Sequence, residues 1–250
     1  MESVVIGLDL AAGNGVTAMA ALKLAQRDAE SQATLSLLSL TYPLDDEAIL
    51  AEVACHTPLV VGIDAPLSLP MPVASAVLGA APSAGLSPYT RAAERDPIWA
   101  RLGVRPFPVS FLGGLTFRAI PLAARLRARF GSTQVIEVFP TATLAALNLR
   151  PPATRTAPRL RKTEAPARRA IQHALAQLIS GVAAPDDDTQ PLDADSLDAL
   201  AAALTAATHT LDSAQAIGDP DEGCIVLPTQ DAQDRFVRVS PSIAPPDGHE

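Results

Sequence analysis

Two stretches of this chain nearly repeat each other, and they constrain the fold more than any other feature. Residues 4–9 read VVIGLD and residues 59–64 read LVVGID. Continuous runs of branched apolar residues are typical of strands buried on both faces of a parallel or mixed sheet. Each run ends in an aspartate that follows a glycine by two residues, so the two side chains share a face of the strand. Neighbouring strands in register lie about 4.8 Å apart, which predicts that Asp9 and Asp64 meet.

Two carboxylates at adjoining strand ends repel each other unless a proton or a cation joins them. The ends of buried strands are also where α/β folds place their chemistry. We therefore expect Asp9 and Asp64 to bind a divalent metal, with the preceding glycines removing bulk beside the carboxylates. Asx-turns at the strand ends are the alternative for both residues.

The order of predicted elements is three strands, a helix, a strand, an irregular Pro-rich stretch with helices, and a further strand. This predicts an α/β fold whose five-stranded mixed sheet begins with three antiparallel strands and carries helices on both faces. A helical insertion is expected at about residues 70–130, between strands four and five, and a short strand at residues 224–227. The order recurs in the ribonuclease H-like fold. With 250 residues, we expect one domain over residues 1–230 and a disordered tail over 231–250.

Charge is distributed unevenly along the chain. The net charge is −8, yet residues 91–169 contain 15 of the 19 lysines and arginines and only four acids, so that segment carries +11 and the remainder −19. A basic lobe beside an acidic centre suits a phosphate-bearing substrate. Solvated helix faces are an equally weighted alternative. The most basic stretch, residues 149–166, is expected to be an exposed loop.

Aromatic residues concentrate in the same part of the chain. Six of the nine lie between Tyr89 and Phe130, interleaved with arginines. Such a pattern can stack bases and hold phosphates. The more common explanation, which we favour, is that these rings form the local core of the insertion.

Three further acids complete a candidate metal site. Glu137 lies in the predicted strand at residues 134–139, and Asp195 and Asp198 share a face of the helix predicted at residues 195–211. Mg²⁺ and Mn²⁺ prefer such oxygen ligands, and two ions about 4 Å apart can cleave a phosphodiester. Each acid also has a structural explanation: Asp195 as a helix N-cap with Asp198 three residues later, and Glu137 as the partner of an arginine.

Several motifs in order resemble the domain-of-unknown-function 429 family, whose members are predicted nucleases with a ribonuclease H-like fold. They are GLDLA, VVGIDAPLSLP, TRAAERD, RPFPVSFLGGL, VIEVFPTATL, DSLDALAAALTA and GDPDEGCIVLP, and they run from about residue 4 to residue 228. The resemblance implies an acidic catalytic centre of Asp9, Asp64, Glu137 and Asp198, with Asp195 as a further metal ligand. It adds three arginines as candidates for substrate binding, Arg91, Arg95 and Arg118, and includes Glu222 without indicating its role.

The leading hypothesis is therefore a hydrolase, a Mg²⁺- or Mn²⁺-dependent nuclease that acts on nucleic acid or a small phosphoester. A phosphotransferase related to actin and sugar kinases is the alternative, with Gly13 and Gly15 presenting backbone N–H groups to a nucleotide. A non-catalytic binding protein is the third. With no basic or long apolar leader and two widely separated cysteines, we expect a cytoplasmic protein with free thiols and no membrane contact.

Overall fold

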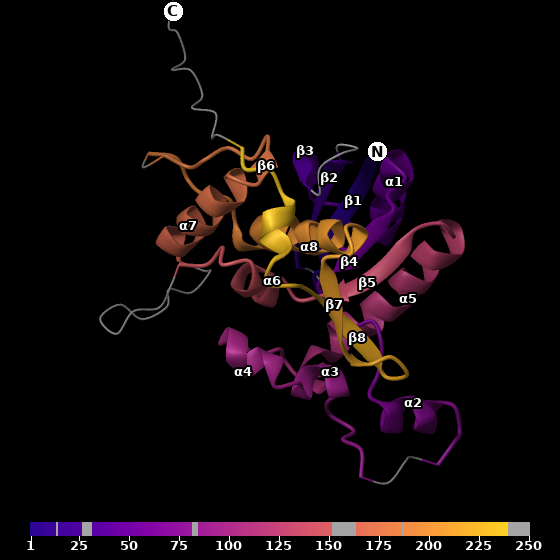
Figure 1. Ribbon diagram of the computed structural model, residues 1–250. Helices are drawn as coiled ribbons and strands as arrows, with labels where there is room; N and C mark the ends of the chain where they lie inside the picture. The colour runs from indigo at the N-terminus through magenta and orange to yellow at the C-terminus, as the bar shows by residue number, and fades with distance from the viewer. Residues whose placement is uncertain (14, 27–31, 82–84, 152–163, 187, 240–250) are drawn as a thin grey trace, which may run out of the picture.

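The computed structural model describes residues 1–13, 15–26, 32–81, 85–151, 164–186 and 188–239 (Figure 1). Most of the basic loop expected at residues 149–166 lies outside the described residues, as do residues 240–250.

All eight strands of the described chain belong to one mixed sheet in the order β6-β3-β2-β1-β4-β5-β8-β7. The first three are antiparallel neighbours, and β4 lies parallel to β1, as predicted. The sheet has eight strands where we expected five. The short strand predicted at residues 224–227 is β8, which pairs with β5, while the two-residue β6 and the largely exposed β7 form the two edges. The strands are β1 (Glu2–Asp9), β2 (Ala18–Gln26), β3 (Ala33–Thr41), β4 (Val60–Ile63), β5 (Gln134–Val138), β6 (Ile179–Ser180), β7 (Ala214–Asp219) and β8 (Gly223–Pro228).

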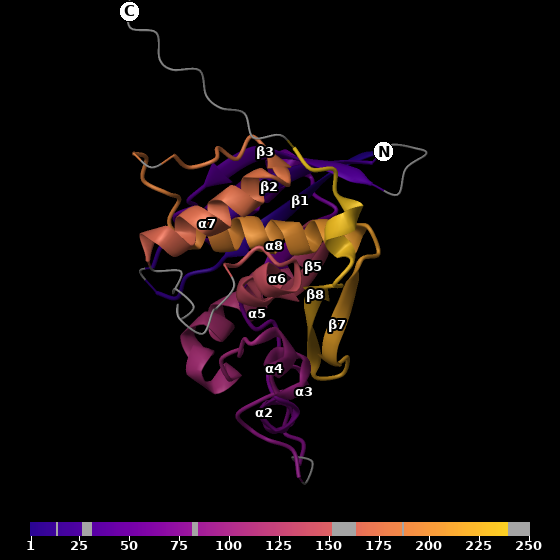
Figure 2. The same cartoon turned by 60° about the vertical axis from the view of Figure 1, so that its left-hand side comes forward.

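Helices cover both faces of the sheet, so the predicted α/β class is confirmed (Figures 1 and 2). One face packs residues such as Val5 and Val60 against α6, α7 and α8. The other packs Ile6, Leu8 and Ile63 against α1 and α5. The helices are α1 (Asp46–His56), α2 (Met71–Val77), α3 (Ala92–Arg95), α4 (Ile98–Leu102), α5 (Gly113–Arg129), α6 (Pro140–Ala146), α7 (Ala165–Ala176) and α8 (Ala194–Thr210), with 3₁₀ turns η1 (Val109–Leu112) and η2 (Ala232–Arg235).

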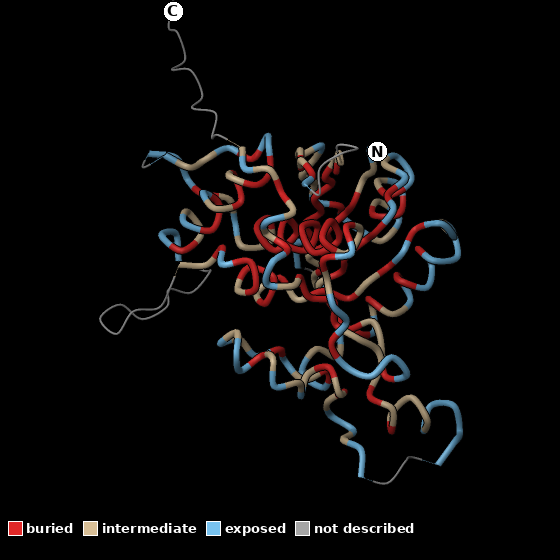
Figure 3. Tube along the Cα trace, in the orientation of Figure 1, coloured by how far each residue is buried: buried red, intermediate tan, exposed pale blue. Residues whose placement is uncertain are grey.

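Helix α8 lies at the centre of the molecule, and Figure 3 shows buried residues along its whole length. The two repeated glycines explain its close approach to the sheet. A Cβ atom on Gly7 would lie 2.1 Å from the Ala203 nitrogen, and one on Gly62 would lie 2.9 Å from the Ala202 oxygen. The glycines therefore admit the α8 backbone, which is a stronger constraint than the expected removal of bulk beside the aspartates.

The segment between β4 and β5 contains α2 to α5 and η1. The helical run Val109–Arg129 has the length and apolar composition of a membrane span, a test that core helices also pass. A stripe of α5 that includes Ala119, Leu122 and Leu126 packs on the sheet.

The chain after β8 remains packed as far as residue 239, whereas we expected disorder from residue 231. Phe236 is buried in the core beside α8. The Val237 N–H donates to the Ala33 carbonyl, and the Val239 N–H donates to that of Gln177. These contacts fix the C-terminal segment against the β3 edge of the sheet.

Candidate active site

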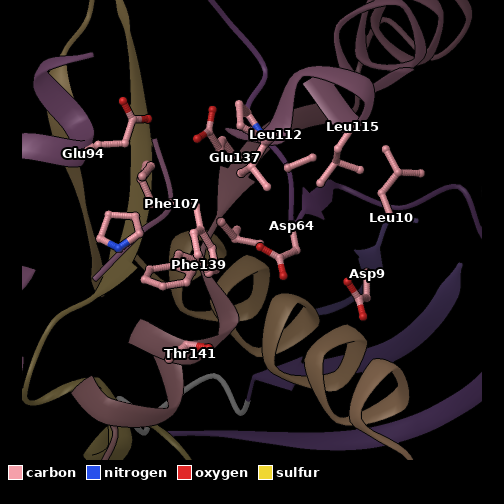
Figure 4. A pocket seen from close by; sticks show the side chains of 15 residues that line it. Asp9, Leu10, Asp64, Glu94, Phe107, Leu112, Leu115, Glu137, Phe139 and Thr141 are labelled. Carbon is pink, nitrogen blue, oxygen red and sulfur yellow. The ribbon is translucent and has the colours of Figure 1, made fainter. Parts of the chain in front are cut away.

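Asp9 and Asp64 lie beside each other at the ends of β1 and β4. The two strands pair in parallel, with Leu8 opposite Ile63, and the Asp64 N–H donates to the Leu8 carbonyl over 2.8 Å. Both aspartates are partly exposed and open into one cavity of about 330 Å³ (Figure 4). The repeated strand sequence thus brings together the two carboxylates that it predicted.

The wall of this cavity is largely apolar. Residues after β5, Phe139 and Thr141, form one side, while Phe107, Leu112 and Leu115 come from the segment between β4 and β5 (Figure 4). Trp99 of α4 packs edge-on against Phe139 with ring centres 5.9 Å apart, which holds α4 against this wall. Apolar walls reduce the local dielectric and strengthen electrostatic interactions with the two carboxylates.

Glu137 lines the same cavity as the aspartates, but its carboxylate is paired with Arg91. It pairs in register with Ile63, one residue before Asp64, and therefore points to the opposite face of the sheet. Its two carboxylate oxygens accept hydrogen bonds from both terminal nitrogens of Arg91, and Oε2 also accepts one from the Leu67 N–H. The alternative role, pairing with an arginine of the basic segment, is the one observed.

Arg91 is fully buried and serves the fold, whereas we expected it to bind substrate. Its Nε and Nη2 donate to Glu94, its Nη1 and Nη2 to Glu137, and Nη1 also to the Ser68 hydroxyl. The Arg91 N–H and side chain also form a reciprocal cap with Glu94 at the start of α3. All the donors of this guanidinium contact protein atoms, so it has none to offer a ligand.

Burial and pairing act in opposite directions on this ion pair. Burial raises the pKa of the Glu137 carboxyl above its usual value, against the lowering effects of Arg91 and the Leu67 N–H. Burial alone would lower the pKa of Arg91, but hydrogen bonds and charge from Glu137 and Glu94 raise it overall, so Arg91 remains charged.

Glu222 connects the β7–β8 turn to two helix starts. Its carboxylate accepts hydrogen bonds from the Met71 N–H at the start of α2 and from the Ala92 N–H at the start of α3. Its carbonyl accepts one from the Ser68 hydroxyl. Negative charge at helix N-termini is favourable, so Glu222 stabilises the segment that forms the outer wall of the site.

The other two arginines also lie away from the aspartates. Arg118 donates to Asp46, the Ala11 carbonyl and the Thr17 hydroxyl, and so ties the loop after β1 to the start of α1. These contacts give Arg118 a structural role, and substrate binding by its partly exposed side chain stays a prediction. Arg95 is exposed on α3, where its Nε donates to the Arg91 carbonyl.

The acidic face of α8 points toward the same end of the sheet. Ala199 and Ala202 of α8 lie against Gly7 of β1. Asp195 and Asp198 precede these two alanines by four residues, so they lie one turn earlier on the same face of the helix. The start of α8 lies near Tyr42, whose hydroxyl is 2.6 Å from that of Ser196, just beyond β3. Because β3 and β1 run in the same direction, this is also the end that carries Asp9.

Neither α8 acid caps the helix as the alternative suggested. The N-cap is Asp193, whose side chain accepts from the Ser196 N–H. Asp198 is buried, and the described residues that line the cavity do not include it or Asp195. Within the described ranges, no group of three or more His, Cys, Asp or Glu side chains is arranged to hold a metal ion.

Glu94 was missed from the sequence as a residue of this cavity, and Phe107 was noted only as one of six clustered aromatics. Glu94 follows Arg91 by three residues, and that spacing is a signal for the reciprocal cap at a helix start. Phe107 stands between two prolines in an irregular stretch, where no periodicity indicates the direction of a side chain.

Comparisons with known proteins give one match. A family model described as "Protein of unknown function (DUF429)" matches residues 7–223. No curated protein and no solved structure matches the chain.

Proposed function

The chain belongs to this family, and we propose that it hydrolyses phosphodiesters with a Mg²⁺ or Mn²⁺ ion held between Asp9 and Asp64. The observation that carries the proposal is the parallel register of β1 and β4, which ends in two carboxylates on one open cavity. Like charges at adjoining strand ends favour a bound cation.

We further propose that the fold is ribonuclease H-like. The order β3-β2-β1-β4-β5, with three antiparallel strands followed by parallel ones, supports this assignment. Strands β6, β7 and β8 extend that arrangement at its two edges.

The site suits a Mg²⁺ ion that is bound by two carboxylates and keeps several waters, and does not suit an ion enclosed by protein ligands. Mg²⁺ usually keeps several waters and binds one or two carboxylates together with substrate phosphate oxygens. Asp9 and Asp64 meet that need, and Asp198 or Asp195 on the neighbouring face of α8 offers a further oxygen. A bound ion would activate a water and offset negative charge on the phosphoryl group.

The protein residues around the pair have separate tasks in this proposal. Asp9 and Asp64 orient the ion, and the Phe107 and Phe139 walls limit access of bulk water. The ion pair of Arg91 with Glu137 fixes α3 to the end of β5, and so keeps the wall in place.

The phosphotransferase alternative is less well supported. Gly13 and Gly15 border a separate cavity of about 410 Å³ that is also lined by Asp45, Asp46 and Glu47. Arg118, the one cation among the described residues that line it, pairs with Asp46. Three carboxylates at this cavity would repel a nucleotide polyphosphate.

The test compares Asp64→Asn with Asp219→Asn, which removes the same charge from an exposed position at the end of β7. We expect Asp64→Asn to abolish Mn²⁺-dependent cleavage of oligonucleotides and of a small phosphodiester. It should also remove the calorimetric signal of Mn²⁺ binding, while nucleic-acid binding is kept or tightened because a repelling charge is lost. Asp219→Asn should leave all three unchanged.

Absence of Mn²⁺ binding in the unmodified protein would contradict the proposal and favour a non-catalytic binding protein. Binding of nucleotide with phosphate transfer would favour the phosphotransferase.

A further inference from the structure

We propose that the aromatic side chains at the mouth of the cavity stack the bases of a single-stranded nucleic acid, which makes single strands the substrate class of this site. This inference rests on the proposed function. It defines an aromatic rim of three residues, Tyr89, Phe107 and Phe111.

The rim is exposed, contrary to our expectation that these aromatics form the core of the insertion. The exposed fractions are 66% for Tyr89, 67% for Phe107 and 80% for Phe111, whereas Trp99 alone of the segment's six aromatics is buried. Burying aromatic rings is favourable, so three rings left in water represent a cost that binding a partner would recover.

The three rings adjoin the cavity that holds the aspartates. Phe107 lines it directly, and Leu112, next to Phe111, lines it as well. The Tyr89 carbonyl accepts from the N–H of Ser110, the residue before Phe111, which places Tyr89 beside the same turn. A base stacked on the rim would thus lie next to a backbone phosphate at the two carboxylates.

Cations accompany the rings. Arg105 stands two residues before Phe107, and Arg101 lies in the preceding helix α4. Both are exposed, and neither side chain makes a hydrogen bond or ion pair with the part of the chain that the structure describes. Rings for bases and free guanidinium groups for phosphates are the two features that single-strand binding requires.

Arg101 extends the path beyond the rim. It also lines a polar cavity of about 580 Å³, together with Asn148, Arg150 and Gln230. A strand that crosses the rim can therefore continue along α4 to this second, polar cavity. The length of this path favours a polymer over a small phosphoester.

Single strands fit the rim better than duplexes. Bases in a duplex stack on one another, so only unpaired bases offer their faces to side chains. A surface that bound duplex through phosphates alone would need no exposed rings.

The experiment measures fluorescence anisotropy in EDTA, so that binding is separated from cleavage. The probes are a labelled oligothymidine, a duplex of the same length and an abasic oligonucleotide of the same length and charge. Phe117→Ala is the matched control, because Phe117 is also exposed (71%) but lies about half a turn of α5 from its buried stripe.

We expect the single strand to bind at least tenfold more tightly than the abasic strand or the duplex. Phe107→Ala or Phe111→Ala should weaken that binding about tenfold, Phe107→Trp should retain it, and Phe117→Ala should not change it. Circular dichroism and thermal unfolding check that each variant is folded.

Equal binding of abasic and base-bearing strands would overturn the inference. So would rim-dependent sedimentation with anionic vesicles in place of strand binding, because the rim would then be a membrane-contact surface. Cleavage of a small phosphodiester without strand binding would remove this inference and keep the proposed function. Rim-dependent strand binding with no Mn²⁺-dependent cleavage would contradict the proposed function and keep the aromatic rim as a binding surface for single strands.

Discussion

Two groups of carboxylates stand at the same end of the sheet, and they differ in their surroundings. Asp9 and Asp64 face an open cavity from the α8 side. Glu137 and Glu94 share one buried guanidinium, that of Arg91. The strand register explains the difference. Glu137 lies opposite Ile63, whereas Asp64 is the next residue and therefore points to the other face of the sheet. Glu94 and Glu137 hold the fold together through an internal cation, whereas Asp9 and Asp64 are partly exposed in a cavity that a ligand can enter.

The largest effect should follow from removing the buried cation. Arg91→Met leaves Glu94 and Glu137 buried without their partner, and we expect a loss of about 3–5 kcal/mol in the free energy of unfolding. Urea denaturation measures it. Arg95→Met is the control, because it removes an exposed arginine from the same helix and should cost less than about 0.5 kcal/mol.

The same variant should show a characteristic pH dependence. Burial already raises the pKa of Glu137, and losing Arg91 raises it further. A carboxyl whose folded-state pKa is raised contributes stability below its unfolded pKa and loses it as pH rises through the folded value. The deficit of Arg91→Met should therefore be smaller at pH 5 than at pH 8. A deficit independent of pH would mean that lost packing, not unpaired charge, is the cause.

The second-largest effect concerns Glu222, in the turn between β7 and β8. Glu222→Ala removes the acceptor of two helix N–H groups, those of Met71 and Ala92. We expect a loss of about 1–3 kcal/mol in unfolding free energy, because two partly buried donors are left unsatisfied. Asp221→Ala, an exposed neighbour in the same turn, should be nearly neutral. Equal effects of the two variants would show that the turn itself matters and the Glu222 carboxylate does not.

The third effect tests the open pair. Asp64→Asn removes one of two neighbouring like charges at a partly exposed position, so the free energy of unfolding should change by less than about 1 kcal/mol. Thermal unfolding without divalent ions measures it. A loss as large as that of Arg91→Met would place Asp64 among the structural acids and erase the contrast between the two groups.

Much of this fold could be predicted from local pattern. The repeated GLD and GID strand ends gave the adjacency of β1 and β4, because side-chain alternation and a buried apolar run are local properties. The two-residue β6 and the exposed β7 could not be predicted, since a two-residue strand has no period and an exposed edge has no apolar pattern. Those strands depend on pairing across the fold.

The candidate site could be predicted only in part, for a similar reason. Asp9 and Asp64 follow from the strands themselves, but the face of Glu137 depends on the register between β4 and β5, which no local pattern specifies. Arg91 illustrates the same limit. Its motif indicates importance, and only the fold shows that its five donors are directed at Glu94, Glu137 and Ser68.

The smallest effect is measured at Cys224, whose thiol responds to the charges of Glu137 and Arg91. Burial raises the pKa of the Cys224 thiol, and the charges of Asp219 and Glu137 raise it further, against a lowering effect of Arg91. The thiolate of Cys224 should therefore form only above the usual pH for a cysteine. In a Cys55→Ser background, the pH profile of iodoacetamide alkylation reports on Cys224 alone, since these are the two free cysteines.

In that background, Asp219→Asn should shift the alkylation midpoint to lower pH by a few tenths, because an exposed charge acts weakly through solvent. Asp221→Asn is the matched control and should leave the midpoint in place. Adding Arg91→Met should shift it upward, since the cation that stabilises the thiolate is lost. A downward shift would show that Glu94 and Glu137 become protonated when Arg91 is removed, so that their charge depends on their cation.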